Sequence, residues 1–282
     1  MSEEAGGGRR TPLDMDVIDV HTHAFPDAVA AAAIAALEEE AGVVARYDGT
    51  VGGLLGAMDR TGIAVSVIQP VATRPGQVER INDWAASIAS ERIVPFGAMH
   101  PDLKDPSGEV ARMSSLGIRG FKMHPEYQDF RPDEERLLPI LEAAMEHDMV
   151  VLFHCGLDIA VPTLNGDPAA FARMLDRTPG LEAILAHMGG FGLWDDVRRH
   201  LVGRDVWLDT SYTLGHLPED EFVGILRAHG ADRVLFGSDG PWTDAGEERA
   251  LLEASGLTAD ELRCVLVENA GRLLSGRAGE GQ

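Results

Sequence analysis

Two histidines separated by one residue follow a run of apolar residues near the start of the chain. His21 and His23 come directly after residues 17–20, whose sequence Val-Ile-Asp-Val is typical of a strand. In an extended chain, side chains at positions i and i+2 leave on the same face, so both imidazoles can reach one metal ion. A catalytic divalent ion takes at least three protein ligands and keeps one position open for water. The sequence therefore predicts further ligands elsewhere in the chain.

Later strand-like runs also end in residues that can hold a metal ion. The residues at these ends are Lys122, His154, His187 and Asp239, each at the same relative point of its own run. Histidines scattered through a core would not keep this spacing. The pattern indicates one metal site to which several strands contribute.

Short β-rich runs alternate with longer amphipathic runs along the chain. We expect strands at residues 16–20, 63–69, 93–99, 118–123, 149–154, 182–187, 206–209 and 233–237. We expect helices at residues 28–41, 78–90, 133–146, 168–176 and 218–228, and a closing helix at 262–274. Apolar strands separated by helices predict parallel pairing through right-handed crossovers. Together these elements predict an α/β fold, a (β/α)8 TIM barrel in a single domain, with its functional residues at the carboxyl ends of the strands.

The length and composition of the chain are consistent with such a barrel. With 282 residues and 45% hydrophobic content, the chain can bury the core of one large domain. We expect the barrel to span residues 12–276, preceded by a flexible amino terminus at 1–11 and followed by a flexible tail at 277–282. The formal net charge of -22 argues against nucleic acids and anionic membranes as partners.

Cysteine use and hydropathy indicate a cytoplasmic protein. Cys155 and Cys264 are far apart in the sequence, which suggests neither a disulfide framework nor a thiolate metal site. No apolar stretch approaches the roughly 20 residues of a membrane-spanning helix, and the first residues lack the apolar core of a signal peptide.

The predicted strand ends carry short motifs that point to a family. They are DVHTH at residues 19–23, GFKMHP at 120–125, FHCG at 153–156, AHMGG at 186–190 and LFGSDGPW at 235–242. In this order they resemble the amidohydrolase superfamily, and in particular its amidohydrolase-related branch, which includes the aminocarboxymuconate semialdehyde decarboxylase-like proteins. The resemblance covers nearly the whole barrel. It implies that His21, His23, His154 and Asp239 bind a divalent ion, zinc above all, and that Asp239 and His187 are catalytic.

Lys122 decides how many ions the resemblance implies. Lys104 and Lys122 are the only lysines in the chain, so a lysine at the barrel mouth suggests chemistry that arginine cannot perform. In binuclear members of the superfamily, a lysine at this place is carboxylated and bridges two metals, and Lys122 and His187 would then be ligands. Many relatives in the amidohydrolase-related branch hold one ion, which is the arrangement we favour. Lys122 would then be a cation that holds a substrate carboxylate.

The leading functional interpretation is a metal-dependent hydrolase of a small organic substrate, acting on an amide, ester or lactone bond. The alternative is a lyase, a metal-dependent non-oxidative decarboxylase or a hydratase acting on an unsaturated carboxylic acid. Arg74, His124 and Trp242 are candidate substrate-binding residues, with Tyr212 as a further wall of the pocket. A homodimer would be typical of the family. A binding protein that kept the scaffold would lack a ligand, and none is missing.

Overall fold

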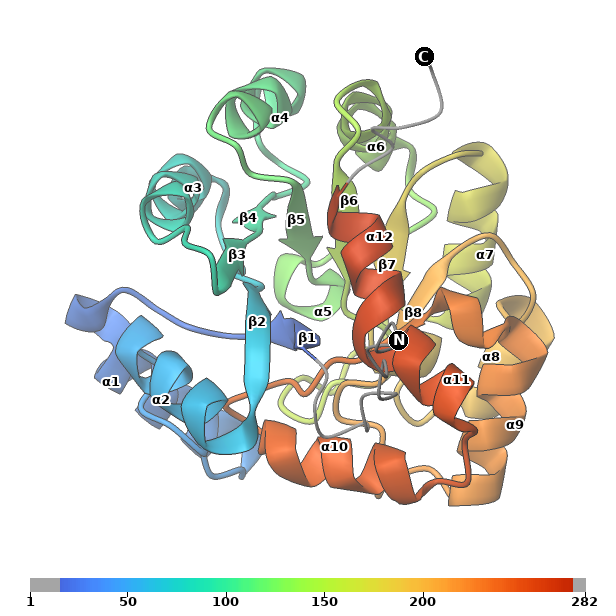
Figure 1. The fold of residues 1–282 in the computed structure, drawn as a ribbon. Helices are drawn as coiled ribbons and strands as arrows, with labels where there is room; N and C mark the ends of the chain where they lie inside the picture. Colours follow the sequence, from blue (N-terminus) through green and yellow to red (C-terminus); the bar gives the residue numbers. More distant parts are fainter. Residues whose placement is uncertain (1–15, 276–282) are drawn as a thin grey trace, which may run out of the picture.

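The fold was obtained as a computed structural model and is described for residues 16–275 (Figure 1). The predicted flexible ends, residues 1–11 and 277–282, lie outside the described residues. The predicted domain limits at residues 12 and 276 lie outside them as well, so these limits stay predictions.

Parallel strands form the centre of the molecule. The strands are β1 (Val17–Thr22), β2 (Ile63–Ile68), β3 (Ile93–Pro95), β4 (Gly97–Ala98), β5 (Gly120–Met123), β6 (Val150–Phe153), β7 (Ala183–Leu185), β8 (Trp207–Asp209) and β9 (Val234–Leu235). They pair in the orders β1-β2-β3 and β4-β5-β6-β7-β8-β9. The expected strand at residues 93–99 is thus interrupted at Phe96, whose N–H still donates to the carbonyl of Ile68 at 3.0 Å.

Hydrogen bonds between the first and last strands close the ring. The N–H of Val20 donates to the carbonyl of Phe236 at 2.9 Å, and the N–H of Asp239 donates to that of His21 at 2.8 Å. The N–H of His23 donates to the carbonyl of Gly240 at 2.6 Å. With β3 and β4 taken as one interrupted strand, the described residues form the predicted eight-membered barrel, which confirms the predicted fold class.

Most of the helices surround the barrel on its outer side (Figure 1). They are α1 (Asp27–Ala41), α2 (Val51–Thr61), α3 (Val78–Ser87), α4 (Pro106–Ser115), α5 (Pro125–Gln128), α6 (Leu138–Glu146), α7 (Pro168–Arg177), α8 (Trp194–His200), α9 (Glu219–His229), α10 (Ala245–Ala254), α11 (Ala259–Arg263) and α12 (Asn269–Ser275). Short 3-10 turns lie at Pro75–Gln77, Glu135–Leu137, His187–Gly189 and Ala231–Arg233, and a π-helical turn, Cys264–Glu268, joins α11 to α12. The predicted closing helix is therefore present as one continuous helical segment from residue 259 to 275, with a π-helical turn in its middle.

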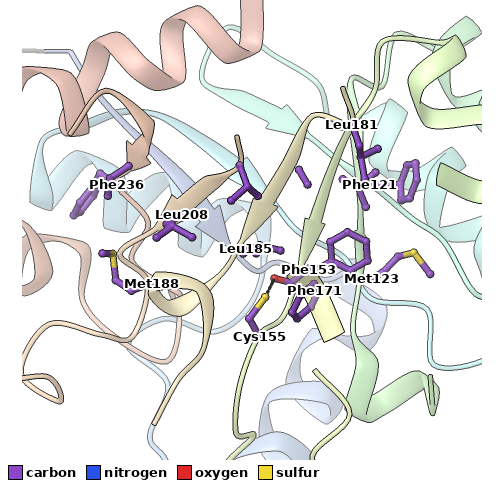
Figure 2. Close-up of a cluster of buried hydrophobic side chains, with 14 of the residues drawn as sticks. Phe121, Met123, Phe153, Cys155, Phe171, Leu181, Leu185, Met188, Leu208 and Phe236 are labelled. Atoms are coloured by element: carbon purple, nitrogen blue, oxygen red, sulfur yellow. Dashed lines mark hydrogen bonds between the residues drawn. The ribbon is translucent and has the colours of Figure 1, made fainter. Parts of the chain in front are cut away.

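Alternate strand residues fill two separate hydrophobic layers. Phe121, Phe153 and Leu185 point outward and pack beneath the helices, where Phe153 meets Phe171 of α7 edge-on (Figure 2). The intervening residues, such as Leu152 and Ile184, fill the barrel interior together with Ala270 and Leu273 of α12. Because α12 contributes to the inner layer, it covers one end of the barrel and leaves the opposite end for the polar side chains.

Within residues 16–275, no helix combines the length and the apolar composition that crossing a bilayer requires.

Candidate metal centre

The carboxyl ends of the strands bring all six predicted ligands to one cavity of about 710 Å³. These six residues are His21 in β1, His23 just after it, Lys122 in β5, His154 after β6, His187 after β7 and Asp239 after β9. They come from five different strands of the barrel. The cavity therefore exists only where the barrel positions these strand ends together.

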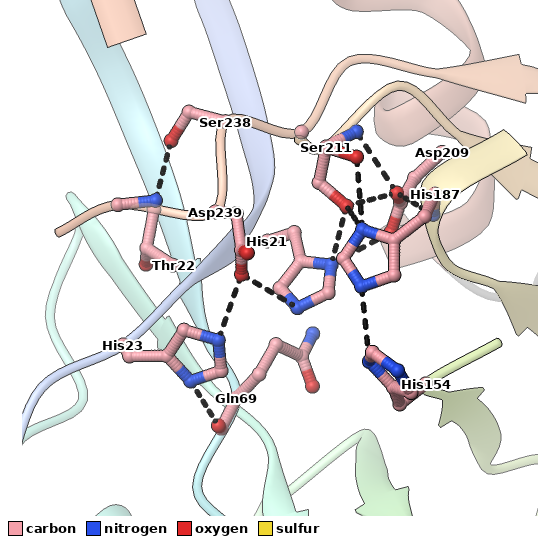
Figure 3. Close-up of polar contacts among 12 residues, drawn as sticks. His21, Thr22, His23, Gln69, His154, His187, Asp209, Ser211, Ser238 and Asp239 are labelled. Atoms are coloured by element: carbon pink, nitrogen blue, oxygen red, sulfur yellow. Dashed lines mark hydrogen bonds and ion pairs between the residues drawn. The ribbon is translucent and has the colours of Figure 1, made fainter. Parts of the chain in front are cut away.

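His21, His23 and Asp239 form the first group of potential ligand atoms (Figure 3). The Oδ1 atom of Asp239 lies 3.0 Å from Nε2 of His23 and 3.4 Å from Nε2 of His21. The hydrogen bonds that close the barrel hold the backbones of these residues. Asp239 also has a φ of 72°, in the left-handed region, where the chain turns sharply after β9. An imidazole, imidazole and carboxylate set of this kind suits zinc and other divalent first-row metals.

Hydrogen-bond acceptors behind His21 and His23 hold Nδ1 of each imidazole ring. Nδ1 of His21 lies 2.9 Å from Oδ2 of Asp209, and Nδ1 of His23 lies 2.9 Å from the carbonyl oxygen of Gln69. Both partners accept hydrogen bonds, so each ring donates through Nδ1 while its Nε2 faces the cavity and Asp239. This is the arrangement that metal-binding histidines use.

Asp209 stays ionised at the back of the site. Burial alone would raise the pKa of Asp209, but its contacts with His21 and the hydrogen bond from Ser211 outweigh burial and lower the pKa to about 2. Burial likewise opposes ionisation of Asp239, yet His21 and His23 hold the pKa of that carboxyl well below its ordinary value. Both carboxylates are therefore acceptors at neutral pH.

His187 is oriented in the same way as the first two histidines. Its Nδ1 lies 2.9 Å from the carbonyl oxygen of Ser211, and its backbone N–H donates to Oδ1 of Asp209 at 3.0 Å. Its Nε2 therefore carries a lone pair and lies 3.1 Å from Nδ1 of His154. Asp209 thus supports two histidines of the site.

Lys122 lies inside the group of ligands. Its Nζ atom is 2.9 Å from Nε2 of His21, and only 1% of the residue is exposed. Burial is the main cause that lowers the pKa of Lys122 to about 8. The side chain therefore has access to its neutral form under mild conditions.

A second group of potential ligand atoms lies beside the first and consists of His124, His154 and Asp158. The rings of His124 and His154 stack at 4.1 Å, and Oδ2 of Asp158 lies 3.5 Å and 3.9 Å from their Nε2 atoms. Glu126 approaches the same two rings. Among the described residues, Oε2 of Glu126 and Nε2 of His154 are buried without a hydrogen-bond partner. The predicted ligand His154 therefore belongs by distance to this second group.

The predicted substrate-binding residues divide into two sets. His124, Trp242 and Tyr212 line the cavity. Arg74 is exposed and is not among the lining residues, whereas Arg80, which the sequence analysis did not select, is among them. The structure therefore does not bring Arg74 to the site.

Residues behind the ligands were missed by the sequence analysis. Asp209 ends β8 at the same relative point as the predicted ligands end their strands, so its signal was present in the sequence. Glu126 lies in the short helix α5 and Asp158 in the loop after β6. Neither of these two acids follows a strand directly, and nothing in the local sequence marks them.

Comparisons with known proteins agree with this geometry. The Amidohydrolase family model matches residues 18–276. No protein with a curated record matches the chain significantly.

Solved structures share the fold at low sequence identity. An uncharacterised TIM-barrel protein from Bordetella bronchiseptica is 19% identical with a TM-score of 0.75, and the match covers 93% of this chain and 99% of that one. A protein from Pseudomonas putida proposed to be a 2-pyrone-4,6-dicarboxylic acid hydrolase is 22% identical with a TM-score of 0.66, covering 94% and 99%. A 5-carboxyvanillate decarboxylase from Novosphingobium aromaticivorans, with bound manganese and a nitrobenzoic acid derivative, is 16% identical with a TM-score of 0.70, covering 93% and 98%. These likenesses agree with the barrel described above, and the family match over nearly its whole length shows that the chain belongs to the amidohydrolase family.

Proposed function

We propose that this protein is a metal-dependent hydrolase that cleaves an amide, ester or lactone bond of a small organic substrate. The observation that carries the proposal is that three histidines lining one cavity each have Nδ1 held by a hydrogen-bond acceptor. His21, His23 and His187 are fixed by Asp209, the carbonyl of Gln69 and the carbonyl of Ser211. Rings held in this way have the orientation that metal-binding histidines use.

The residues present fit a divalent ion, and we propose zinc. His21, His23 and Asp239 would hold it, with His154 as the fourth predicted ligand. An ion bound there would lower the pKa of a water molecule to about 7 and would polarise a substrate carbonyl.

The residues of the chain then have separate tasks. Asp239 is ionised and faces the cavity, so it can accept the proton of the attacking water and pass it to the leaving group. Nε2 of His187 faces the same cavity and, once protonated, can stabilise negative charge on the substrate oxygen. Trp242 and Tyr212 contribute apolar walls that position the substrate.

We propose one ion, with a second only if Lys122 is carboxylated. The neutral amine, made accessible by burial, is the form that reacts with carbon dioxide to give a carbamate. The metal-to-protein ratio should be measured by plasma mass spectrometry for the native protein, Lys122→Ala and the matched control Lys104→Ala, which alters the exposed lysine. A ratio near one in all three proteins supports one ion.

Carboxylation itself can be observed directly because the chain has only two lysines. Protein exchanged with 13C-bicarbonate would give one carbamate carbon signal, lost in Lys122→Ala and kept in Lys104→Ala, if two ions share this residue. Such a signal together with a ratio near two would contradict the one-ion proposal.

The alternative function is a lyase, a decarboxylase or hydratase of an unsaturated carboxylic acid. Two observations support this alternative. A structural neighbour is a named decarboxylase, and Lys122 and Arg80 line the cavity as basic residues that could bind a substrate carboxylate. Metal-loaded protein should be assayed against a panel of esters, lactones and amides for acid release, and against hydroxylated benzoates for carbon dioxide release, with Asp239→Asn as the inactive control. Turnover confined to the second panel would replace the hydrolase by the lyase.

A further inference from the structure

The cavity extends well beyond the metal centre, between helices α1 and α3. Val29, Ala33, Leu37 and Ala41 of α1 line it. These residues are four positions apart, so they form one face of the helix. Both helices lie on the same side of the barrel as β2 (Figure 1).

The wall contributed by α3 has the same apolar character. Ile81 and Trp84 line the cavity from this helix, and Arg80 is the only charged lining residue on either helix. We call the part of the cavity lined by α1 and α3 the apolar arm. At its other end the same cavity contains the imidazoles and Asp239, so a single molecule can occupy both parts.

The mouth of the cavity exposes large apolar side chains. Val29, Leu157 and Ile159 line the cavity and are 49%, 43% and 48% exposed. Apolar side chains gathered at one concave site mark a place where a ligand removes them from water. A cavity of about 710 Å³ is of the size that takes a ligand much larger than a single ring.

We propose that the substrate carries an extended apolar chain or ring system, which lies in the apolar arm between α1 and α3 while its reactive carbonyl group reaches the metal centre. The inference rests on the proposed function, because the metal centre supplies the chemistry. It adds the substrate class: an amphiphilic amide, ester or lactone in place of a small polar one.

A series of straight-chain hydroxamic acids tests this directly. The hydroxamate group chelates metal ions, and its alkyl chain would enter the arm. Binding of the acids from acetohydroxamic to decanohydroxamic acid to the metal-loaded protein is measured by calorimetry. We expect Kd to fall by up to about fourfold for each methylene until the arm is full.

Two matched tryptophan variants of α1 test whether the alkyl chain of the ligand lies in the apolar arm. Ala33→Trp fills the arm and should end the gain in affinity at a shorter chain, with acetohydroxamic acid unaffected. Ala35→Trp places the same ring on an exposed position of α1 that does not line the cavity, and should keep the native series. Leu37→Gln keeps the size of the side chain and adds polarity, so it should reduce the gain in affinity for each methylene. This variant tests the arm if Ala33→Trp does not fold.

The binding results distinguish failure of the apolar arm from failure of the proposed metal-dependent function. Tight binding of acetohydroxamic acid with no dependence on chain length overturns the apolar arm and leaves the metal centre in place. Failure of acetohydroxamic acid to bind counts against the metal centre, and the arm is then judged with straight-chain alcohols, which lack a chelating group. A flat alcohol series together with a dimer that Ala33→Trp dissociates would show that a second copy of the chain covers this face, and would overturn the proposal.

Discussion

Nδ1 of His154 faces Nε2 of His187 at 3.1 Å, and the His187 ring has already used its own hydrogen on the carbonyl of Ser211. Without an ion, the hydrogen between the two rings must therefore belong to His154. Nε2 of His154 is then left as a buried lone pair without a donor, since the carboxyl oxygens of Glu126 and Asp158 nearest to it are 3.9 Å away. The pair is a proton donor and acceptor that faces the cavity directly.

Substitution of His187 should affect turnover more than metal content. In His187→Asn we expect kcat to fall by about 10²- to 10⁴-fold, because an acid or base of the reaction is lost. The metal-to-protein ratio should stay near the native value if one ion is bound. His100→Asn is the matched control, because His100 is buried in a turn outside the cavity lining. Activity within a few-fold of native in His187→Asn would exclude a catalytic role.

Asp209 should influence metal affinity without touching the ion. Asp209→Asn replaces a pure acceptor by an amide that can present N–H to His21, so the His21 ring no longer holds its hydrogen on Nδ1. We expect zinc affinity to fall by about 10- to 100-fold, measured by competition with a chromophoric chelator. Asp205→Asn, which alters an exposed acid just before β8, should leave the affinity unchanged. Equal affinities in the two variants would contradict the assigned role.

Removal of the metal should destabilise the fold. A ligand that binds only the folded state adds about 2.7 kcal/mol when its concentration is 100 times Kd. For a protein of this size, each kcal/mol shifts Tm by about 2–4 °C. Dialysis against a chelator should therefore lower Tm by several degrees, and zinc should restore it. An unchanged Tm after proven loss of metal would mean that the strand ends do not hold the ion.

Acid should weaken the fold through a histidine remote from the cavity. Nε2 of His229 donates to the carbonyl of Val206 at 2.9 Å, and its Nδ1 accepts from the N–H of Gly203. Burial is the main cause that lowers the pKa of His229 below its ordinary value of 6.5, and Arg233 adds to it.

The lowered pKa of His229 makes the folded protein less stable in acid. Below pH 6.5 the unfolded chain takes up a proton at His229 that the folded chain resists, so the free energy of unfolding falls as the pH is lowered. His229→Gln keeps a donor toward Val206 and cannot titrate. Urea unfolding of both proteins between pH 7 and pH 5 should show their stabilities approaching each other as the pH falls. A constant difference would exclude this titration.

Arg80 should matter for substrates that carry a carboxylate. It lines the cavity, whereas Arg74 is exposed outside it. Arg80→Gln should raise KM for carboxylate-bearing substrates by about 10-fold or more, the order expected when a charged hydrogen bond is lost. Arg74→Gln should leave KM unchanged, as should Arg80→Gln with uncharged substrates. The reverse pattern would restore Arg74 as the substrate anchor.

The barrel and the set of candidate ligands could be predicted from sequence because they depend on local patterns. His21 and His23 follow an apolar run at a spacing that a strand turns into one face. Asp239 and His187 follow equally clear runs. The barrel then brings these strand ends together, whatever the length of chain between them.

The division of these ligands into two groups could not be predicted, because it depends on ring orientation. The ring of His154 lies against His124, and Asp158 and Glu126 reach it from a loop and from the short helix α5. Positions of this kind are set by loop geometry, which no periodic pattern records. The misplacement of Arg74 has the same origin, since the direction of a loop side chain is fixed only by its tertiary contacts.

The bonds between His21 and Asp239 and between His23 and Gly240 join the first strand of the barrel to the segment that follows its last strand. A nascent chain on the ribosome that already displays both early histidines still lacks the carboxylate that completes their set. An ion at the proposed site would therefore find its full set of ligands only after β9 has docked against β1.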